Sequence, residues 1–245
     1  MQFQLEICCF NIQSALVAQD AGAHRVELCA DPAGGGTTPS LGVIKTAREK
    51  LHIQLYPIIR PRDGDFLFDD EEFEIMIRDI SFCKQAGCDG IVIGMLNADG
   101  TIDKKRCAKL VELAYPLGVT FHRAFDRAVN PFEAMEDILS IGCERILTSG
   151  QKPTAIEGAM LLNELVRQAE NRIIIMPGSG IRAKNIAELI EKTTAEEFHT
   201  SARIFGKSGM EFINENLKES DSFTIADKNE ITQIIHLLVN SKNFS

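Results

Sequence analysis

The sequence contains no apolar run that approaches the roughly 18 residues needed to cross a membrane. It also lacks the clustered lysines and arginines of a broad nucleic-acid surface, because 35 acidic residues outnumber 26 basic ones and give a net charge of -9. Residues 1–6 have no basic region followed by an apolar stretch, so we expect no secretory signal there. These absences predict a cytoplasmic protein that binds neither a membrane nor nucleic acid.

The cysteines lack the arrangement of a disulfide framework. There are seven, an odd number, and they are spread through segments expected to form the core. This usage favours reduced thiols in a cytosol. Cys83, Cys88, Cys107 and Cys143 lie among apolar neighbours on expected helices or junctions, and we expect them to pack in the core.

Short apolar runs alternate with segments of helical spacing along the chain of 245 residues. The expected strands are 5–9, 25–29, 54–60, 90–94, 119–123, 145–149, 172–176 and 197–201. The expected helices are 12–21, 43–50, 73–85, 105–115, 131–139, 159–168, 185–191 and 228–239. Eight strand–helix units in this length predict a single α/β domain over residues 1–245, a (β/α)8 barrel of the TIM type.

Two further features fit this pattern. Gly22, Gly87 and Gly142 stand where the helices before the second, fourth and sixth strands are expected to end, and glycine takes the left-handed backbone conformation at low cost. Residues 204–227 contain glycines, serines and no helical spacing. We therefore expect an irregular segment before the last helix.

A Glu-x-Cys motif occurs twice, as Glu6-Ile7-Cys8 and Glu27-Leu28-Cys29, on the first two expected strands. Alternation along a strand sends each carboxylate and its thiol to the same face. Buried carboxylates need a charge partner, for which Arg60, His122 and His199 are available. Two such glutamates favour a functional role, whereas the cysteines alone favour packing as small apolar residues.

In a barrel of this kind, functional residues lie at the carboxyl ends of the strands. Carboxylates and imidazoles there would transfer protons, and arginines would neutralise the charge of a small anionic or phosphorylated metabolite. No lysine stands at a strand end to form a Schiff base, since Lys152 follows Gly150 in a loop. The candidate catalytic residues are Glu6, Glu27, Arg60, His122, Arg123, Asp126 and His199.

Glycine-rich loops are candidate anion sites. Gly178, Ser179 and Gly180 follow the seventh strand, where barrels often bind phosphate through backbone N–H groups. Ser149 and Ser201, at the ends of the sixth and eighth strands, join them as candidate cofactor-binding residues. Residues 34–36 are all glycine, and three roles are open for them: a lid, an anion nest, or a loop that merely needs unusual backbone angles.

Six separated stretches resemble the CutC copper-homeostasis family. They are Arg25-Val26-Glu27-Leu28-Cys29, Thr38-Pro39-Ser40-Leu41-Gly42, Ile59-Arg60-Pro61-Arg62-Asp63-Gly64-Asp65-Phe66, Thr120-Phe121-His122-Arg123-Ala124-Phe125-Asp126, Arg145-Ile146-Leu147-Thr148-Ser149-Gly150 and Glu197-Phe198-His199-Thr200-Ser201-Ala202. The resemblance implies a TIM-like barrel, a cytoplasmic setting, a homodimer or higher homo-oligomer, and an association with copper. It also implies that the thiols of Cys8 and Cys29 are candidate copper ligands. The chain departs from the family at Glu211 and Ile213, which replace basic residues.

Two functions are open on this basis. In the first, Cys8 and Cys29 lie on adjacent strands about 4.8 Å apart and capture Cu(I), a soft ion that prefers thiolates. In the second, the barrel is an enzyme that uses glutamate and histidine acid–base chemistry on a small anionic or phosphorylated metabolite. The resemblance favours copper homeostasis as the biological role.

Overall fold

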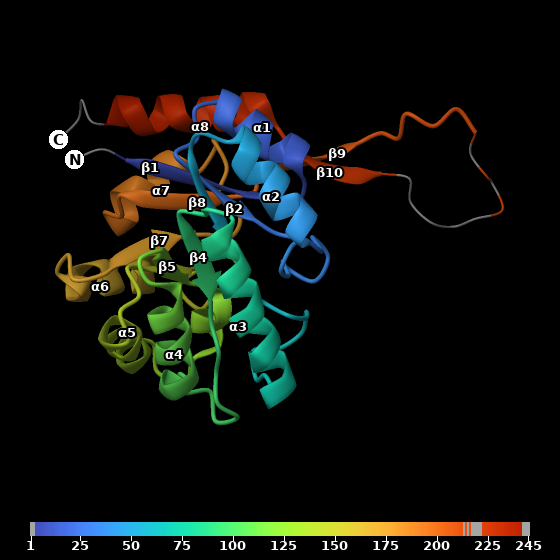
Figure 1. The fold of residues 1–245 in the computed structure, drawn as a ribbon. Helices are drawn as coiled ribbons and strands as arrows, with labels where there is room; N and C mark the ends of the chain where they lie inside the picture. Colours follow the sequence, from blue (N-terminus) through green and yellow to red (C-terminus); the bar gives the residue numbers. More distant parts are fainter. Residues whose placement is uncertain (1–2, 213, 215, 217–221, 242–245) are drawn as a thin grey trace.

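The computed structural model describes residues 3–212, 214, 216 and 222–241, and strands and helices alternate along them (Figure 1). The barrel strands are β1 (Gln4–Cys9), β2 (Arg25–Leu28), β3 (Gln54–Pro57), β4 (Gly90–Ile93), β5 (Gly118–Phe121), β6 (Arg145–Thr148), β7 (Ile174–Pro177) and β8 (Glu197–Thr200). The helices are α1 (Ile12–Asp20), α2 (Leu41–Lys50), α3 (Asp70–Gln85), α4 (Lys104–Ala114), α5 (Pro131–Ser140), α6 (Ala159–Ala169), α7 (Ile186–Thr193) and α8 (Lys228–Asn240), with a 3-10 helix η1 (Arg123–Arg127) after β5. The predicted alternation of strand and helix is confirmed.

The strands follow one another around a barrel. One sheet has the order β3-β2-β1-β8 and the other the order β4-β5-β6-β7, and the pairings within both are parallel. A parallel bridge between Ile58 and Val92 links β3 to β4, and β7 lies against β8. The fold is therefore the predicted α/β barrel of the TIM type, with the helices packed outside the strands.

Local chemistry sets where the helices begin and end. Asp69 caps α3 through a capping box with Glu72, in which each side chain accepts a backbone N–H. Gly22, Gly87 and Gly142 have φ values of 91°, 78° and 92°, so the predicted helix ends are confirmed. In the described part of the chain, no helix is both long enough and apolar enough to cross a membrane.

The segment before α8 is more regular than its sequence indicated. The strands β9 (Arg203–Gly206) and β10 (Phe223–Ala226) pair in antiparallel fashion and project from the barrel (Figure 1). Both contain β-branched and aromatic residues that favour strand pairing where the chain doubles back. We call residues 203–212 and 222–226 the arm. Glu211 belongs to it, whereas Ile213 lies outside the described residues.

A network of buried charges lies at the amino-terminal ends of the strands. Arg25 forms an ion pair with Glu6, and its Nη2 lies 2.6 Å from Oε2 of Glu197. The Nε of Arg145 lies 2.6 Å from the same oxygen. All four side chains are buried. Guanidinium and carboxylate groups alternate, so each charge has partners that offset the cost of removing it from water.

We expect Glu197→Gln to lower the free energy of unfolding by about 3 kcal/mol, because it deprives two buried arginines of a shared counter-charge. Urea unfolding followed by circular dichroism measures this loss. Glu136→Gln is the matched control: its partner Arg172 is exposed, and we expect a much smaller loss because solvent screens the pair. Equal losses in the two variants would show that the buried network does not stabilise the barrel.

Candidate functional site

A cavity of about 380 Å³ opens at the carboxyl ends of the strands. Its wall contains most of the residues that the sequence predicted for a site: Cys8, Glu27, Arg60, His122, Arg123, Ser179, Gly180, His199 and Ser201. The other predicted residues lie behind this wall, and each of them lies next to a residue that forms it. They are Glu6, Cys29, Asp126, Ser149 and Gly178. The structure thus brings the predicted residues into one region.

The two Glu-x-Cys motifs are staggered across the barrel. The strands β1 and β2 pair so that Glu6 lies opposite Arg25 and Cys8 lies opposite Glu27. Such a stagger accompanies the tilt of strands in a closed barrel. Glu6 therefore lies one layer deeper than Glu27, and Cys8 and Glu27 share the layer that faces the cavity.

Glu6 joins the buried charge network to the cavity. One of its carboxylate oxygens contacts Arg25, and the other lies 2.7 Å from Nδ1 of His199. Burial opposes the charge of Glu6, but Arg25 and His199 outweigh burial and lower its pKa to about 2. The expected guanidinium partner was Arg60. The register of β1 and β2 gives that position to Arg25 instead.

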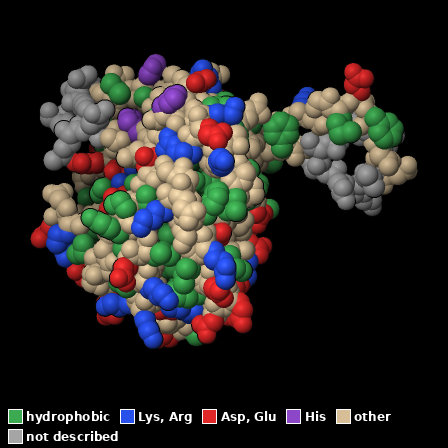
Figure 2. Space-filling view, viewed as in Figure 1, with side chains coloured by type: hydrophobic (Ala, Val, Ile, Leu, Met, Phe, Trp, Pro, Cys, Tyr) green, Lys and Arg blue, Asp and Glu red, His purple; other side chains and the backbone are tan. Residues whose placement is uncertain are grey.

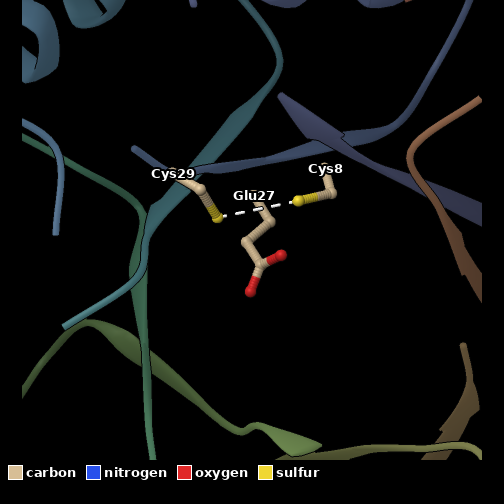
Figure 3. Close-up of side chains that lie close together, drawn as sticks. All are labelled: Cys8, Glu27 and Cys29. Carbon is tan, nitrogen blue, oxygen red and sulfur yellow. Dashed lines mark hydrogen bonds between the residues drawn. The ribbon is translucent and has the colours of Figure 1, made fainter. Parts of the chain in front are cut away.

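Above Glu6, four side chains form what we call the thiol corner: Cys8, Glu27, Cys29 and His199. The two sulfur atoms point toward each other and lie 3.6 Å apart, with the carboxylate of Glu27 beside them (Figure 3). One ligand atom from each of these three residues lies within 4.8 Å of the others. The Nε2 of His199 lies 3.7 Å from Oε2 of Glu27.

The charges within the thiol corner depend on one another. Hydrogen bonding with Cys29 lowers the pKa of Cys8 to about 5, against burial and with the help of His199. Burial would lower the pKa of His199, but contacts with Cys8 and Glu6 raise it well above its usual value. Burial and then Cys8 raise the pKa of Glu27. The corner therefore favours a Cys8 thiolate, a His199 imidazolium and a protonated Glu27.

Arg60 lies in the cavity wall without a carboxylate partner. Its guanidinium donates to the carbonyl oxygens of Gly34 and Gly36, each at 2.8 Å, and of Gly64 at 3.1 Å. No carboxylate among the described residues forms an ion pair with it, although the side chain is only 4% exposed. Because residues 34–36 turn carbonyl groups toward this cation, they do not form an anion nest.

Asp126 anchors Arg123 at the rim of the cavity. Its oxygens accept hydrogen bonds from Nε of Arg123 at 2.8 Å, from the hydroxyl of Thr148, and from both the backbone N–H and the hydroxyl of Ser149. Ser149 also receives a hydrogen bond from Nη2 of Arg123 at 3.1 Å. Asp126 and Ser149 thus hold the arginine from behind the wall.

The glycines after β7 have separate structural roles. Ser179 and Gly180 reach the cavity wall, whereas Gly178 lies behind it. A Cβ atom on Gly178 would lie 2.4 Å from Leu147 and 3.3 Å from the His199 ring. The absence of a side chain at Gly178 therefore lets Leu147 and His199 pack closely against the backbone there.

Three arginines at the mouth were missed by the sequence analysis. Arg182 and Arg203 line the cavity, and Arg127 lines a neighbouring hollow of about 400 Å³ together with Lys152, which the sequence analysis considered only as a loop residue. Arg25, in the buried network, was also missed as a partner for Glu6. One feature of the sequence could have pointed to Arg25 and Arg145 as partners for buried carboxylates. Each is the first residue of its strand and directly follows a helix-to-strand junction.

Sequence comparison gives the chain close relatives. Residues 3–204 match the CutC family. A copper homeostasis protein cutC homolog of Homo sapiens is 42% identical over 245 residues, which cover 98% of this chain and 90% of the relative. A family protein CutC of Xylella fastidiosa is 49% identical over 199 residues, which cover 81% of this chain and 74% of the relative.

Solved structures support the same relationship. The crystal structure of a copper homeostasis protein CutC from Streptococcus agalactiae has a TM-score of 0.78 at 34% identity and covers 82% of this chain and 99% of that chain. Phosphoribosyl anthranilate isomerase from Thermotoga maritima has a TM-score of 0.62 at 15% identity, covers 98% of this chain and 100% of that one, and shows likeness of fold alone. The chain belongs to the CutC family.

Proposed function

We propose that this protein takes part in copper homeostasis in the cytoplasm by binding Cu(I) through Cys8 and Cys29. The observation that carries this proposal is the 3.6 Å separation of the two sulfur atoms. Metal–sulfur bonds of about 2.3 Å, as in zinc thiolate sites, let one ion contact both sulfurs at this spacing. The names of the relatives as copper homeostasis proteins support the same role.

The donor set of the thiol corner suits a soft ion. Cu(I) prefers thiolates, and Cys8 already favours the thiolate form. Cys29 would lose its proton on binding, as metal-ligating thiols do. Cys8 lines the cavity, so an ion entering from the mouth meets it first. Cys29 lies beneath Gly36. A Cβ atom added to Gly36 would be only 3.3 Å from the sulfur of Cys29.

The cavity itself favours a second candidate function. Its volume of about 380 Å³ falls in the range of roughly 300–1,000 Å³ that is typical of small-molecule pockets and exceeds what one ion needs. Glu27 and His199 would exchange protons with a substrate, and Arg60 and Arg123 would neutralise its charge. We propose, as the alternative, an acid–base enzyme that acts on a small anionic or phosphorylated metabolite.

We also propose that the chain forms a homodimer or higher homo-oligomer through the arm. Hydrophobic side chains gather on the arm where it projects from the barrel (Figure 2). Phe205 and Phe212 are 77% and 75% exposed, and Ile204, Met210 and Phe223 are exposed beside them. Apolar surface of this kind on a projecting segment indicates a contact with another chain.

Copper titration tests the main proposal. In competition with a Cu(I)-specific chelator, we expect the reduced protein to hold one tightly bound ion per chain, and Cys8→Ser and Cys29→Ser each to lose it. Cys88→Ser is the control, because it removes a buried thiol distant in sequence from the corner. An unchanged stoichiometry in the double variant Cys8→Ser/Cys29→Ser would reject this site.

The pH dependence of alkylation tests the thiol corner. The thiolate is the reactive form, so we expect iodoacetamide to modify Cys8 with a midpoint near pH 5 instead of the usual value near 9. His199→Asn should move this midpoint upward, because it removes the neighbouring positive charge. Mass spectrometry of the Cys8 peptide measures the rate, with Cys107, whose pKa burial raises to about 12, as the unreactive control. A wild-type midpoint near pH 9 would contradict the proposed charge state.

Light scattering tests the role of the arm. The double variant Phe205→Ser/Phe212→Ser should lower the solution mass of the protein toward that of one chain, because it removes most of the exposed aromatic surface of the arm. Ile75→Ser, which changes an exposed apolar residue on α3, should leave the mass unchanged. A monomeric wild type, or an unchanged mass in the double variant, would count against assembly through the arm.

A further inference from the structure

Two unsatisfied donors mark one side of the cavity. Among the described residues, the only buried side-chain nitrogen or oxygen atoms without a hydrogen-bond partner are Nε of Arg60 and Nε2 of His122. Both residues line the 380 Å³ cavity, and they are only 4% and 2% exposed. An unpaired buried donor is costly, because it loses its hydrogen bond to water without gaining another. Two of them in the same wall indicate a missing acceptor.

The hydrogen bonding of His122 identifies its free nitrogen as a donor. Its Nδ1 accepts the backbone N–H of Ala124 at 3.1 Å, so the ring proton lies on Nε2. Burial, helped by Arg60, lowers the pKa of His122 to about 3, and the ring is therefore neutral at physiological pH. A neutral donor of this kind can bind an oxygen of a ligand.

Arg60 and His122 both pack against one aromatic ring. The Cζ of Arg60 lies 4.8 Å from the centroid of Phe66, and the ring centroids of His122 and Phe66 are 4.9 Å apart. Asp63 and Asp31 influence Arg60 only from a distance, without an ion pair. This part of the wall therefore holds two unpaired donors and one positive charge, and no carboxylate of the described residues forms an ion pair with Arg60.

The neighbouring hollow extends this positive wall. It shares Gly35, Arg60, Phe66 and Arg123 with the cavity and adds Arg127 and Lys152. Its one acidic residue, Asp126, is engaged by several donors. In a protein of net charge -9, cations gathered at the mouth of the barrel favour the approach of an anion there.

We propose that the mouth binds a small organic dianion, with its charged group at Arg60 and His122 and its carbon chain directed toward the thiol corner. A phosphate monoester and a dicarboxylate share this chemistry. Neither free nitrogen is exposed to solvent, so binding requires each side chain to shift and bring its free N–H to the anion. The proposal names the ligand class of the second candidate function, on which it rests, and it requires no copper.

Calorimetric titration of copper-free protein tests this inference. The probes are glycerol 3-phosphate and malate, with glycerol as the uncharged counterpart. We expect at least one dianion to bind with a stoichiometry of one per chain and glycerol to give no binding. Arg60→Gln and His122→Asn should each weaken that binding at least about tenfold. Which of the two dianions binds distinguishes a phosphate ester from a dicarboxylate.

The variants separate a binding role from a structural one. The Asn side chain in His122→Asn can still accept the N–H of Ala124, while the Nε2 donor is lost. Arg62→Gln is the matched control, because it removes the same charge as Arg60→Gln only two residues along the chain. Unlike Arg60, Arg62 is already paired with Glu72 and Asp65. Melting curves without ligand check that each variant is folded.

Three outcomes would overturn the proposal: no binding of either dianion to the wild type, undiminished binding in both site variants, or an equal loss in Arg62→Gln. Because calorimetry detects binding without turnover, a protein that binds a dianion but does not transform it supports this inference and counts against the enzyme. The copper titration is a separate measurement, so failure of the copper proposal is distinguishable from failure of this one.

Discussion

The site depends on the two contacts that the carboxylate of Glu6 makes. One oxygen contacts Arg25 in the buried network, and the other lies 2.7 Å from His199 in the cavity wall. Arg25 and Arg145 in turn share Glu197, so the charge of Glu6 is held by groups from several strands. A fully buried carboxylate remains ionised only because these cations surround it. The structural network at the base of the barrel therefore controls the charges at its mouth.

This arrangement explains how an ordinary cysteine comes to favour the thiolate, which is the form in which a thiol binds a metal or acts as a nucleophile. The negative charge of Glu6 favours the imidazolium form of His199, and the imidazolium with the thiol of Cys29 favours the thiolate of Cys8. The thiolate then makes ionisation of Glu27 unfavourable, so one carboxyl of the site is charged and the other keeps its proton. Two glutamates that look equivalent in sequence thus have opposite protonation states, as in other sites where environment separates two carboxyl groups.

The sequence was sufficient for the barrel and for most of its mouth, because periodicity assigns strands and the carboxyl ends of parallel strands gather at one edge. It was insufficient for register. The stagger that places Glu6 opposite Arg25 is set by the pairing of β1 with β2, and neither Glu-x-Cys motif alone indicates it. The same limit applies to Arg60, which was expected to balance a carboxylate. Its three carbonyl partners come from loops whose path depends on positive φ angles at Gly35, Gly36 and Gly64.

Copper and a small dianion make opposite demands on their surroundings, and we propose that they bind at different walls of the mouth. The thiol corner comes from β1, β2 and β8 and supplies soft sulfur donors, whereas Arg60 and His122 come from the ends of β3 and β5 and supply positive charge and N–H donors. Within the corner, the imidazolium of His199 offsets the thiolate, so little net negative charge faces an incoming anion. The proposed binding of copper at the thiol corner and the proposed binding of an anion at Arg60 and His122 are therefore compatible. The corner that we propose for Cu(I) and the wall that we propose for a dianion belong to one cavity, which Cys8, Arg60 and His122 all line.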